Sequence, residues 1–425
     1  MNIKLKEFVR DLVRFTPRYF KTRRHLTQEF SIDKLQSAVE KAIINVPYYR
    51  SHDYSSYLPS NSGQFSLDRF PIIDKDEVLG REREFVSRKF IKSLLREEKT
   101  GGSSGKTMKL YYSPTLSIDR TVFPNMIYDK YVGKKHQLAL LRGITPHNGQ
   151  LFERVGGHRV LLSSHLMTAD NVEQYLQILN DEKITCLLAY PSALIVFAGL
   201  ISDSKVRVQL PNLKAIFASS EIFSLEDKKF VKKVFNDVTI IDYYSMSEFA
   251  LAAYSVDLGS YQFNYNYGYV EFLPTEYDTP QGNKIAKIVA TSIMNSTMPL
   301  IRYDTGDLAE IDEHGDVVSI VGRVNHFAVN KSNSLVPCIV IFSNESAKRV
   351  KQYQYYQDTP GVLEVRVLPK SDFSNDDKLA LQADMEMCFN DTMDCVVRVV
   401  DSLEISTVGK LKRMIQKLDI SKYMN

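Results

Sequence analysis

Cysteine is scarce in this chain of 425 residues, and the few cysteines form no metal-binding pattern. The four are Cys186, Cys338, Cys388 and Cys395; they include no Cys-x-x-Cys pair, and no histidine cluster accompanies them. Structural zinc modules require closely spaced cysteine and histidine ligands, so the sequence predicts no structural zinc. Nothing in this cysteine usage requires an oxidising compartment.

Long apolar runs and a strong net charge are also missing. No apolar stretch approaches the roughly 20 residues that a membrane-spanning helix needs, and the N-terminus lacks the uninterrupted apolar core of a signal peptide. We therefore expect a cytoplasmic protein. The formal charge of +3 does not indicate a nucleic-acid partner, and no base-stacking motif supports one.

The N-terminal segment is the one strongly basic part of the chain. Its basic residues are Lys4, Lys6, Arg10, Arg14, Arg18, Lys21, Arg23 and Arg24, against only Glu7 and Asp11. Apolar residues are interleaved at helical spacing, as in a helix that lies on an anionic membrane. The alternative is a surface helix packed on its own domain, which we favour because a charge run is usually a solvated face. We expect at most peripheral membrane contact.

The remaining composition, 44% hydrophobic and 25% charged, is typical of a globular protein of two or three domains. The middle of the chain alternates between strand and helix patterns. Strands are predicted over 184–189, 213–218 and 238–241, and helices over 171–180, 192–202 and 225–235, with Asp170 and Ser224 as caps. This alternation predicts a mostly parallel sheet covered by helices.

The pattern changes towards the C-terminus. Short strands at 269–273, 285–291, 308–311 and 317–321, with a hairpin turn at 314–316, predict an antiparallel subdomain. Two further strands, 362–368 and 396–400, and a helix over 379–389 predict a small α+β domain. We expect an α/β fold with a large domain over 1–322 and a small mobile domain over 323–425.

A glycine- and serine-rich segment is the strongest local signal. It reads Thr100-Gly101-Gly102-Ser103-Ser104-Gly105-Lys106-Thr107. Glycines let backbone N–H groups turn inward, and Lys106 adds positive charge, so the segment suits a polyphosphate. It misses the P-loop pattern by one residue and precedes a strand rather than a helix, so we set a P-loop enzyme aside. The alternative is a flexible hairpin tip.

Four further motifs follow this loop in a fixed order. They are Tyr243-Tyr244-Ser245-Met246-Ser247-Glu248, Arg302-Tyr303-Asp304-Thr305-Gly306-Asp307-Leu308, Gly322-Arg323 and Gly409-Lys410-Leu411-Lys412-Arg413. The ordered set, which extends from about Thr100 to Arg413, resembles the adenylate-forming superfamily of acyl-CoA synthetases, adenylation domains and luciferases. Within it, the chain looks most like the phenylacetate–CoA ligase branch and its relatives in capsular polysaccharide loci.

The resemblance implies a role for each matching residue. Thr100 to Lys106 would bind the phosphates of ATP, and Ser219, Ser220 and Glu221 would form a short turn against the adenine. Tyr244 would border the adenine, Glu248 would bind Mg²⁺, and Asp307 would accept hydrogen bonds from the ribose. Arg323 would contact ribose and phosphate, and Lys410 would be the catalytic lysine. Asn325 falls at the hinge position, which implies domain alternation.

Elementary chemistry agrees with these implied roles. A carboxylate that attacks the α-phosphate brings two anions together, so Mg²⁺, a lysine and loop amides are needed to offset the repulsion. An ionised aspartate is an acceptor that suits ribose hydroxyls, and an arginine fork suits phosphate. Each residue alone has an ordinary alternative as a capping carboxylate or surface cation.

The match departs from the family in the segment that follows the hinge. Relatives that use CoA usually have a glycine near Ser332, where this chain has Ser332 and Asn333. Asparagine tolerates left-handed backbone angles, so the turn can survive. Candidates for the acyl pocket are Tyr190, Pro191, Ser192 and the His147 region. The sequence does not name the acid.

Three functions stay open from the sequence. The first is an acyl-activating enzyme in a surface-polysaccharide pathway, with a thiol, amine or hydroxyl acceptor. The second is a conventional aryl- or acyl-CoA ligase, with CoA as the acceptor. The third is a nucleotide-binding relative without catalysis, against which the presence of Lys410, Glu248 and Asp307 argues.

Overall fold

The structure is a computed structural model, and it describes residues 13–59, 64–100, 108–142, 146, 149–164, 166–279, 282–323, 327–333, 335–337, 349–389, 392–405, 411–412 and 414–423. Its α-helices are α2 (Pro17–Leu26), α3 (Ile32–Asn45), α4 (Pro47–Ser51), α5 (Lys75–Val78), α6 (Pro114–Tyr131), α7 (Val172–Asp181), α8 (Pro191–Ser204), α9 (Leu225–Val234) and α10 (Asn375–Phe389). None of the helices in these ranges is both long and apolar enough to cross a bilayer.

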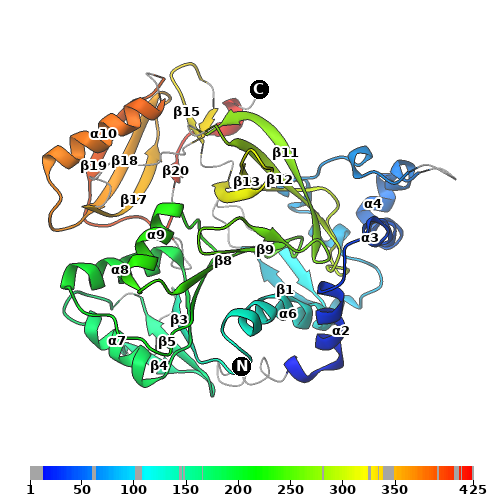
Figure 1. Ribbon diagram of the computed structural model, residues 1–425. Coiled ribbons are helices and arrows are strands. Elements are labelled where there is room, and N and C mark those ends of the chain that lie inside the picture. Colours follow the sequence, from blue (N-terminus) through cyan, green and yellow to red (C-terminus); the bar gives the residue numbers. More distant parts are fainter. Residues whose placement is uncertain are drawn as a thin grey trace.

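A sheet of eight strands forms the centre of the large part of the molecule (Figure 1). Its order is β10-β9-β8-β7-β6-β3-β5-β4. The strands are β3 (Leu138–Arg142), β4 (Phe152–Arg154), β5 (Arg159–Ser163), β6 (Cys186–Ala189), β7 (Ala215–Ser219), β8 (Thr239–Ser245), β9 (Ala252–Val256) and β10 (Gln262–Phe263). The five strands from β8 to β5 pair in parallel, which confirms the predicted parallel sheet.

Alternating side chains of these buried strands enter two different cores. Leu138, Cys186 and Phe217 pack with α6 on one face. Their neighbours Ala139, Leu187 and Ile216 pack with α7, α8 and α9 on the other. Because successive side chains of a strand point to opposite faces, strands that are apolar throughout need helices on both sides.

One predicted detail in this layer is wrong. Asp170 does not cap helix α7; the helix begins at Val172, and the residue at the N-cap position is Asn171. The Asn171 side chain accepts a hydrogen bond from Thr168 N at 2.9 Å and donates to Leu166 O at 2.7 Å. It therefore stabilises the preceding turn instead of the helix end. Ser224 does cap α9, and its hydroxyl accepts from Asp227 N at 3.1 Å.

The second sheet is antiparallel, as the short strands predicted. It consists of β11 (Gly268–Asp278), β12 (Lys284–Ser292), β13 (Tyr303–Ile311) and β14 (Val317–Arg323), in that order. The predicted turn between β13 and β14 contains Gly315 at φ +85°, in the left-handed region that favours glycine. Asp312 Oδ1 closes the turn by accepting from His314 N and Asp316 N at 3.0 and 2.9 Å.

The C-terminal residues form a third sheet with its own core. Its order is β19 (Asp394–Val399), β18 (Val362–Pro369), β17 (Val350–Gln357) and β20 (Met414–Gln416), with α10 packed on it (Figure 1). Two shorter pairs complete the strands: β1 (Arg96–Lys99) with β2 (Lys109–Tyr112), and β15 (Phe327–Val329) with β16 (Leu335–Pro337). The predicted strands β18 and β19 and helix α10 are present, whereas β17 and β20 were not predicted.

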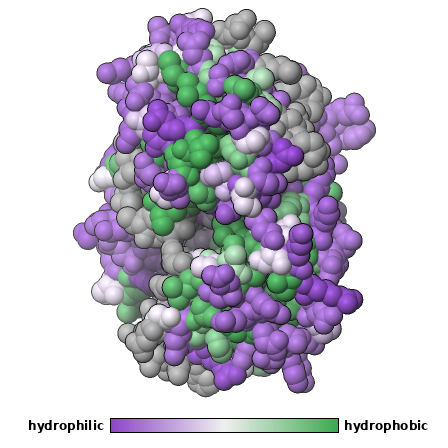
Figure 2. All heavy atoms as spheres, turned by 90° about the vertical axis from the view of Figure 1, so that its left-hand side faces the viewer, coloured by the Kyte–Doolittle hydropathy of each residue, from purple (hydrophilic) through white to green (hydrophobic). Residues whose placement is uncertain are grey.

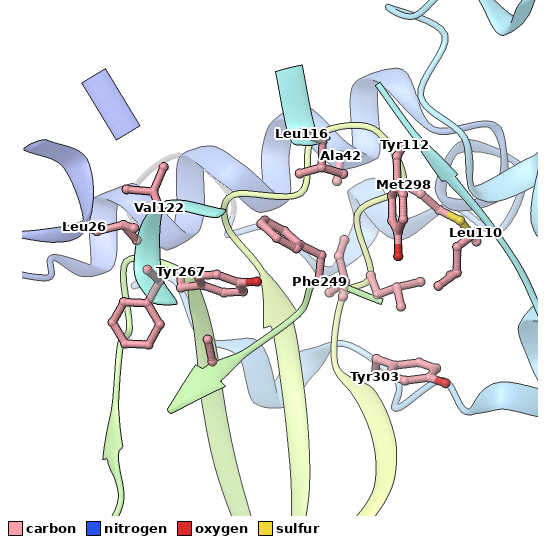
Figure 3. Close-up of a cluster of buried hydrophobic side chains, with 14 of the residues drawn as sticks. Leu26, Ala42, Leu110, Tyr112, Leu116, Val122, Phe249, Tyr267, Met298 and Tyr303 are labelled. Carbon is pink, nitrogen blue, oxygen red and sulfur yellow. The ribbon is translucent and has the colours of Figure 1, made fainter. Parts of the chain in front are cut away.

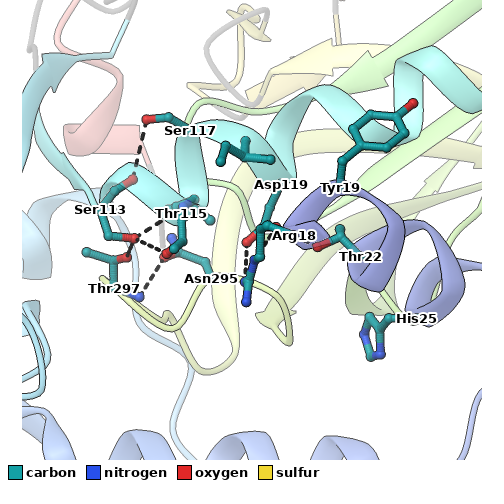
Figure 4. Close-up of polar contacts among 12 residues, drawn as sticks. Arg18, Tyr19, Thr22, His25, Ser113, Thr115, Ser117, Asp119, Asn295 and Thr297 are labelled. Atoms are coloured by element: carbon teal, nitrogen blue, oxygen red, sulfur yellow. Dashed lines mark hydrogen bonds and ion pairs between the residues drawn. The ribbon is translucent and has the colours of Figure 1, made fainter. Parts of the chain in front are cut away.

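The described part of the basic N-terminal segment packs on α6. Arg18 forms a bidentate pair with Asp119, which also accepts from Thr22 Oγ1 at 2.6 Å (Figure 4). Arg23 Nη1 lies 2.6 Å from Asp129 Oδ2. These arginines therefore contact carboxylates of their own domain, as the interpretation of a packed surface helix expects. Residues 1–12 lie outside the described ranges.

Candidate active site

The carboxyl ends of the parallel strands place several predicted residues at one edge of the central sheet. Ser219 ends β7 and is the register partner of Tyr243 on β8. The segments 219–221 and 243–247 therefore lie side by side, as their implied shared site requires. Burial raises the pKa of Tyr243 to about 12, so its hydroxyl stays protonated at neutral pH.

A hydrogen bond joins this edge to the second sheet. Tyr244 Oη donates to Asp307 Oδ2 at 2.8 Å. Asp307 is in turn the register partner of Arg323 across strands β13 and β14. The strands β8, β13 and β14 thus bring together the positions of Tyr244, Asp307 and Arg323, to which the resemblance assigned contacts with one nucleotide.

Arg302, at the start of the Asp307 motif, anchors this part of the second sheet. It is buried at φ +47°, and its guanidinium forms a bidentate pair with Glu271 at 2.9 and 3.1 Å. Its Nη1 also donates to Phe70 O at 2.8 Å. The arginine of the motif therefore has a structural role, and Asp307 is the residue that faces Tyr244.

Glu248 is buried in the turn between β8 and β9 and is held by its backbone. Asn295 Nδ2 donates to Glu248 O at 2.9 Å, and the Tyr112 hydroxyl donates to Ser247 O. A second bond lies beside them, from Thr297 Oγ1 to Ser113 Oγ at 2.9 Å (Figure 4). Sequence reasoning missed Asn295 and Thr297, although a polar run directly after an apolar strand was a usable signal.

An apolar cluster fixes the elements that carry these groups. Tyr112 of β2, Leu116 of α6 and Phe249, which follows Glu248, pack together with Tyr303 of β13 and with Met298, which lies in the connection between β12 and β13 (Figure 3). The hairpin, the glutamate turn and the second sheet therefore share one core. Movement of any one of them relative to the others would open a closely packed interior.

The glycine- and serine-rich segment lies at the tip of the hairpin formed by β1 and β2. Its stem is closed by Thr100, whose N donates to Met108 O at 2.9 Å and whose Oγ1 accepts from Met108 N at 3.0 Å. The strand β2 follows the tip, as predicted, so the segment does not open directly into a helix as a P-loop does. Residues 101–107 themselves lie outside the described ranges.

The predicted lysine and hinge residues also lie outside the described ranges, as does His147, but their flanks are described. Lys410 is followed by Leu411, which forms a bridge with Ile405. The fully buried side chain of Gln354 donates to Glu404 O at 3.0 Å and to Lys412 O at 2.5 Å. Gln354 therefore holds the two flanks of the segment that contains Lys410, which we call the lysine loop. Sequence reasoning missed this role.

A second buried glutamine clamps the chain that follows the hinge position. Gln357 accepts from Val329 N at 2.7 Å and donates to Val329 O at 2.9 Å, which attaches β15 to the third sheet. Beyond β15, Asn333 has φ +59°, so this asparagine does adopt the left-handed angle that the turn requires.

The third sheet contacts the central layer close to the site. Gln352 Nε2 donates to Ser192 O at 3.0 Å at the start of α8, and Lys370 Nζ lies 5.0 Å from the centre of the Phe230 ring. Figure 2 views this side and shows the surface hollowed between the upper part, with the third sheet, and the lower part, with α7 to α9. The C-terminal residues therefore lie against the edge of the sheet that carries the candidate site.

The magnesium role implied for Glu248 fits the chemistry of its position. A buried carboxylate offers the oxygen ligand that Mg²⁺ prefers, and the ion usually retains several waters. The backbone of Glu248 is fixed on both sides by Tyr112 and Asn295. Within the described ranges, no group of three or more His, Cys, Asp or Glu side chains forms a metal cage.

Solved structures with a similar fold include CoA ligases. A 2-hydroxyisobutyryl-CoA ligase in the postadenylation state, in complex with R3-HIB-AMP, matches with a TM-score of 0.65 and 15% identity over 92% of this chain and 90% of that chain. The same ligase with 2-HIB-AMP and CoA in the thioesterification state matches with a TM-score of 0.51 and 15% identity over the same shares. These matches show that the chain has the fold of this CoA ligase.

The chain also has a distant relative among curated proteins. Protein CapK of Staphylococcus aureus is 24% identical to it over 358 residues, which are 79% of this chain and 77% of CapK. No protein-family model matches the chain.

Proposed function

We propose that this protein activates a carboxylic acid as an acyl-adenylate and then transfers the acyl group to an acceptor. The observation that carries the proposal is the bond from Tyr244 to Asp307, beside the buried Glu248 turn. It joins motif residues from two sheets at the edge where a doubly wound sheet binds its ligand. The similarity to CapK favours a surface-polysaccharide pathway in the cytoplasm, where ATP is present.

In the first step, an oxygen of the carboxylate attacks the α-phosphorus of ATP. The bond from the α-phosphorus to the bridging oxygen breaks, and pyrophosphate leaves. Mg²⁺ on Glu248 would supply positive charge at the phosphates, while Lys410 would stabilise the charge that develops in the transition state. Asp307, held by Tyr244, would accept from the ribose hydroxyls, and the hairpin tip 101–106 would bind the phosphates.

In the second step, a thiol, amine or hydroxyl attacks the acyl carbonyl and AMP leaves. We propose two domains, 1–322 and 323–425, with a hinge near Asn325 that moves Lys410 away before this step. The clamp by Gln357 supports this boundary, because β15 is attached to the third sheet whereas β14 belongs to the second.

Conventional CoA ligation is the second candidate function. It is favoured by Asn333, whose left-handed angle keeps the turn that CoA-using relatives build with glycine. The sequence difference at this position therefore does not by itself exclude CoA as the acceptor.

The test is carboxylate-dependent ATP–pyrophosphate exchange with magnesium, across aryl, fatty, amino and sugar acids. We expect exchange with one acid class, and a loss of about 10²-fold or more in Lys410→Ala, because the transition-state charge loses its partner. Lys422→Ala is the matched control, since this exposed lysine lies outside the site. Consumption of CoA in a second pass decides between the two acceptors. ATP binding without exchange, for any acid, would instead indicate a non-catalytic relative.

A further inference from the structure

The order of the parallel strands marks one crevice of the central sheet as the place for a ligand. In the order β8-β7-β6-β3-β5, the chain passes from β3 to β5 on one side and then crosses to β6 on the other. Open α/β sheets bind ligands outside the carboxyl ends of the two strands at which the order reverses. Here these ends carry Arg142, the last residue of β3, and Tyr190, which follows β6.

Arg142 extends across this crevice without a carboxylate partner among the described residues. Its guanidinium carbon lies 5.6 Å from the centre of the Tyr190 ring, and its Nη2 lies 3.4 Å from Ser219 Oγ, at the limit of a hydrogen bond. Its Nε is buried and has no hydrogen-bond partner in the described part of the chain. Buried polar groups are nearly always paired, so this guanidinium retains a strong and unused capacity to bind an anion.

Arg302 is an arginine of the same protein whose guanidinium makes several hydrogen bonds, and it serves as a comparison for Arg142. That guanidinium binds both oxygens of Glu271 and two backbone carbonyls. Within the described ranges, the guanidinium of Arg142 contacts only the Tyr190 ring and the Ser219 hydroxyl. A planar fork of this kind matches a carboxylate in a bidentate arrangement.

Glu221, an acidic residue beside this crevice, binds the start of helix α8 rather than Arg142 in the described part of the chain. Glu221 Oε2 accepts from Ser192 N at 2.9 Å, at the start of helix α8, where the helix N-terminus favours a negative charge. No ion pair joins Glu221 to Arg142 among the described residues. The positive charge of Arg142 therefore remains available beside the apolar face of Tyr190, whose pKa is raised by burial.

We propose that Arg142 binds a second carboxylate of the acid substrate, so that the acids activated here are dicarboxylates. The inference rests on the proposed adenylation. One carboxylate reacts with ATP near Glu248 and Asp307, while the other pairs with Arg142 and the intervening carbons lie against Tyr190. Arg142 is thus a specificity-determining residue at the switch point of the sheet.

The test compares matched acids that differ in the second carboxylate only: pentanoate with glutarate, and hexanoate with adipate. In pyrophosphate exchange, we expect the wild-type protein to prefer the diacid by about tenfold or more in kcat/KM. In Arg142→Leu, this ratio should fall towards one, and Arg142→Lys should keep part of it. Arg154→Leu is the control, because this exposed arginine pairs with Glu182 away from the crevice and should keep the full ratio.

A binding readout separates this inference from the proposed function. Without ATP, millimolar glutarate or adipate should raise the Tm of the wild-type protein and of Arg142→Lys but not of Arg142→Leu, with the ligand-free Tm of each variant as the folding check. If no acid supports exchange, the adenylation proposal fails. The Tm shift then decides by itself whether Arg142 binds a carboxylate of the diacid. Equal losses of exchange for monoacids and diacids in Arg142→Leu, or no Tm shift of the wild-type protein, would overturn the inference.

Discussion

At the scale of single residues, the contact between Tyr244 and Asp307 connects the two large sheets at the candidate site. The hydrogen bond of 2.8 Å fixes one oxygen of this carboxylate. A hydrogen bond to a charged group contributes about 1.5–3 kcal/mol. The orientation of Asp307 therefore depends on a hydroxyl from another strand.

We predict that Tyr244→Phe raises the KM for ATP in pyrophosphate exchange roughly tenfold to 10²-fold, because Asp307 loses its orienting donor. Asp307→Asn should produce a loss at least as large. Steady-state exchange at varied ATP concentration measures both. The double variant should be no worse than Asp307→Asn alone, since both changes act on one contact; full additivity of the two losses would show that Tyr244 acts elsewhere.

At the scale of elements, the third sheet holds the flanks of two segments that carry predicted site residues through buried glutamines. Gln354 bonds to both arms of the loop that contains Lys410, and Gln357 bonds to both backbone groups of Val329 after the hinge. Both side chains come from β17. A single strand thus organises the lysine loop and the hinge-side chain.

We predict that Gln354→Met lowers the rate of adenylation by roughly tenfold to 10²-fold, because small displacements of a catalytic group are enough for such losses. The substitution conserves chain length and removes both donors. Gln382→Met on α10 is the matched control, because its amide bonds to the neighbouring Glu386 on the helix surface. Exchange assays at saturating substrates, with Tm as the folding check, measure the effect. Unchanged exchange in a folded Gln354→Met protein would contradict the clamp.

The limits of sequence-based prediction follow from the same elements. Buried strands such as β6 and β7 were predicted because a short, uninterrupted apolar run between turn residues is typical of a strand covered on both faces. Strand β17 was missed because it is rich in polar residues, two of which, Gln354 and Gln357, are buried and hydrogen-bonded to distant backbone groups. Motif residues were found by their order along the chain.

Residues that act through contacts between distant segments were not found. Asn295 supports Glu248 across 47 positions, and Arg142 gains its meaning only from the strand order that places Tyr190 and Ser219 beside it. Arg142 belongs to no local pattern, and the polar run that contains Asn295 does not show which distant segment it contacts. Their roles depend on topology, which spacing along the sequence does not encode.

At the scale of the whole molecule, the C-terminal part lies against the central layer. The chain matches the postadenylation form of the 2-hydroxyisobutyryl-CoA ligase with a TM-score of 0.65 and its thioesterification form with a TM-score of 0.51. In this arrangement the third sheet contacts α8 and α9 through the pairs Gln352–Ser192 and Lys370–Phe230. If the domains alternate, these contacts must break before acyl transfer.

We predict that fixing this arrangement stops acyl transfer while adenylate formation continues. A cleavable thiol reagent can bridge Phe230→Cys and Lys370→Cys, which face each other across the contact and lie outside the site. Cys186 and Cys395 are buried, and Cys338 and Cys388 would be replaced by serine in the background. Single-turnover assays should show acyl-adenylate accumulating in the bridged protein, with transfer restored after cleavage of the bridge. Each single-cysteine variant, treated identically, should behave as the unbridged protein does. Transfer at the unbridged rate in the bridged protein would mean that the C-terminal part need not move, and that Lys410 and the acceptor reach the acyl-adenylate in the same arrangement.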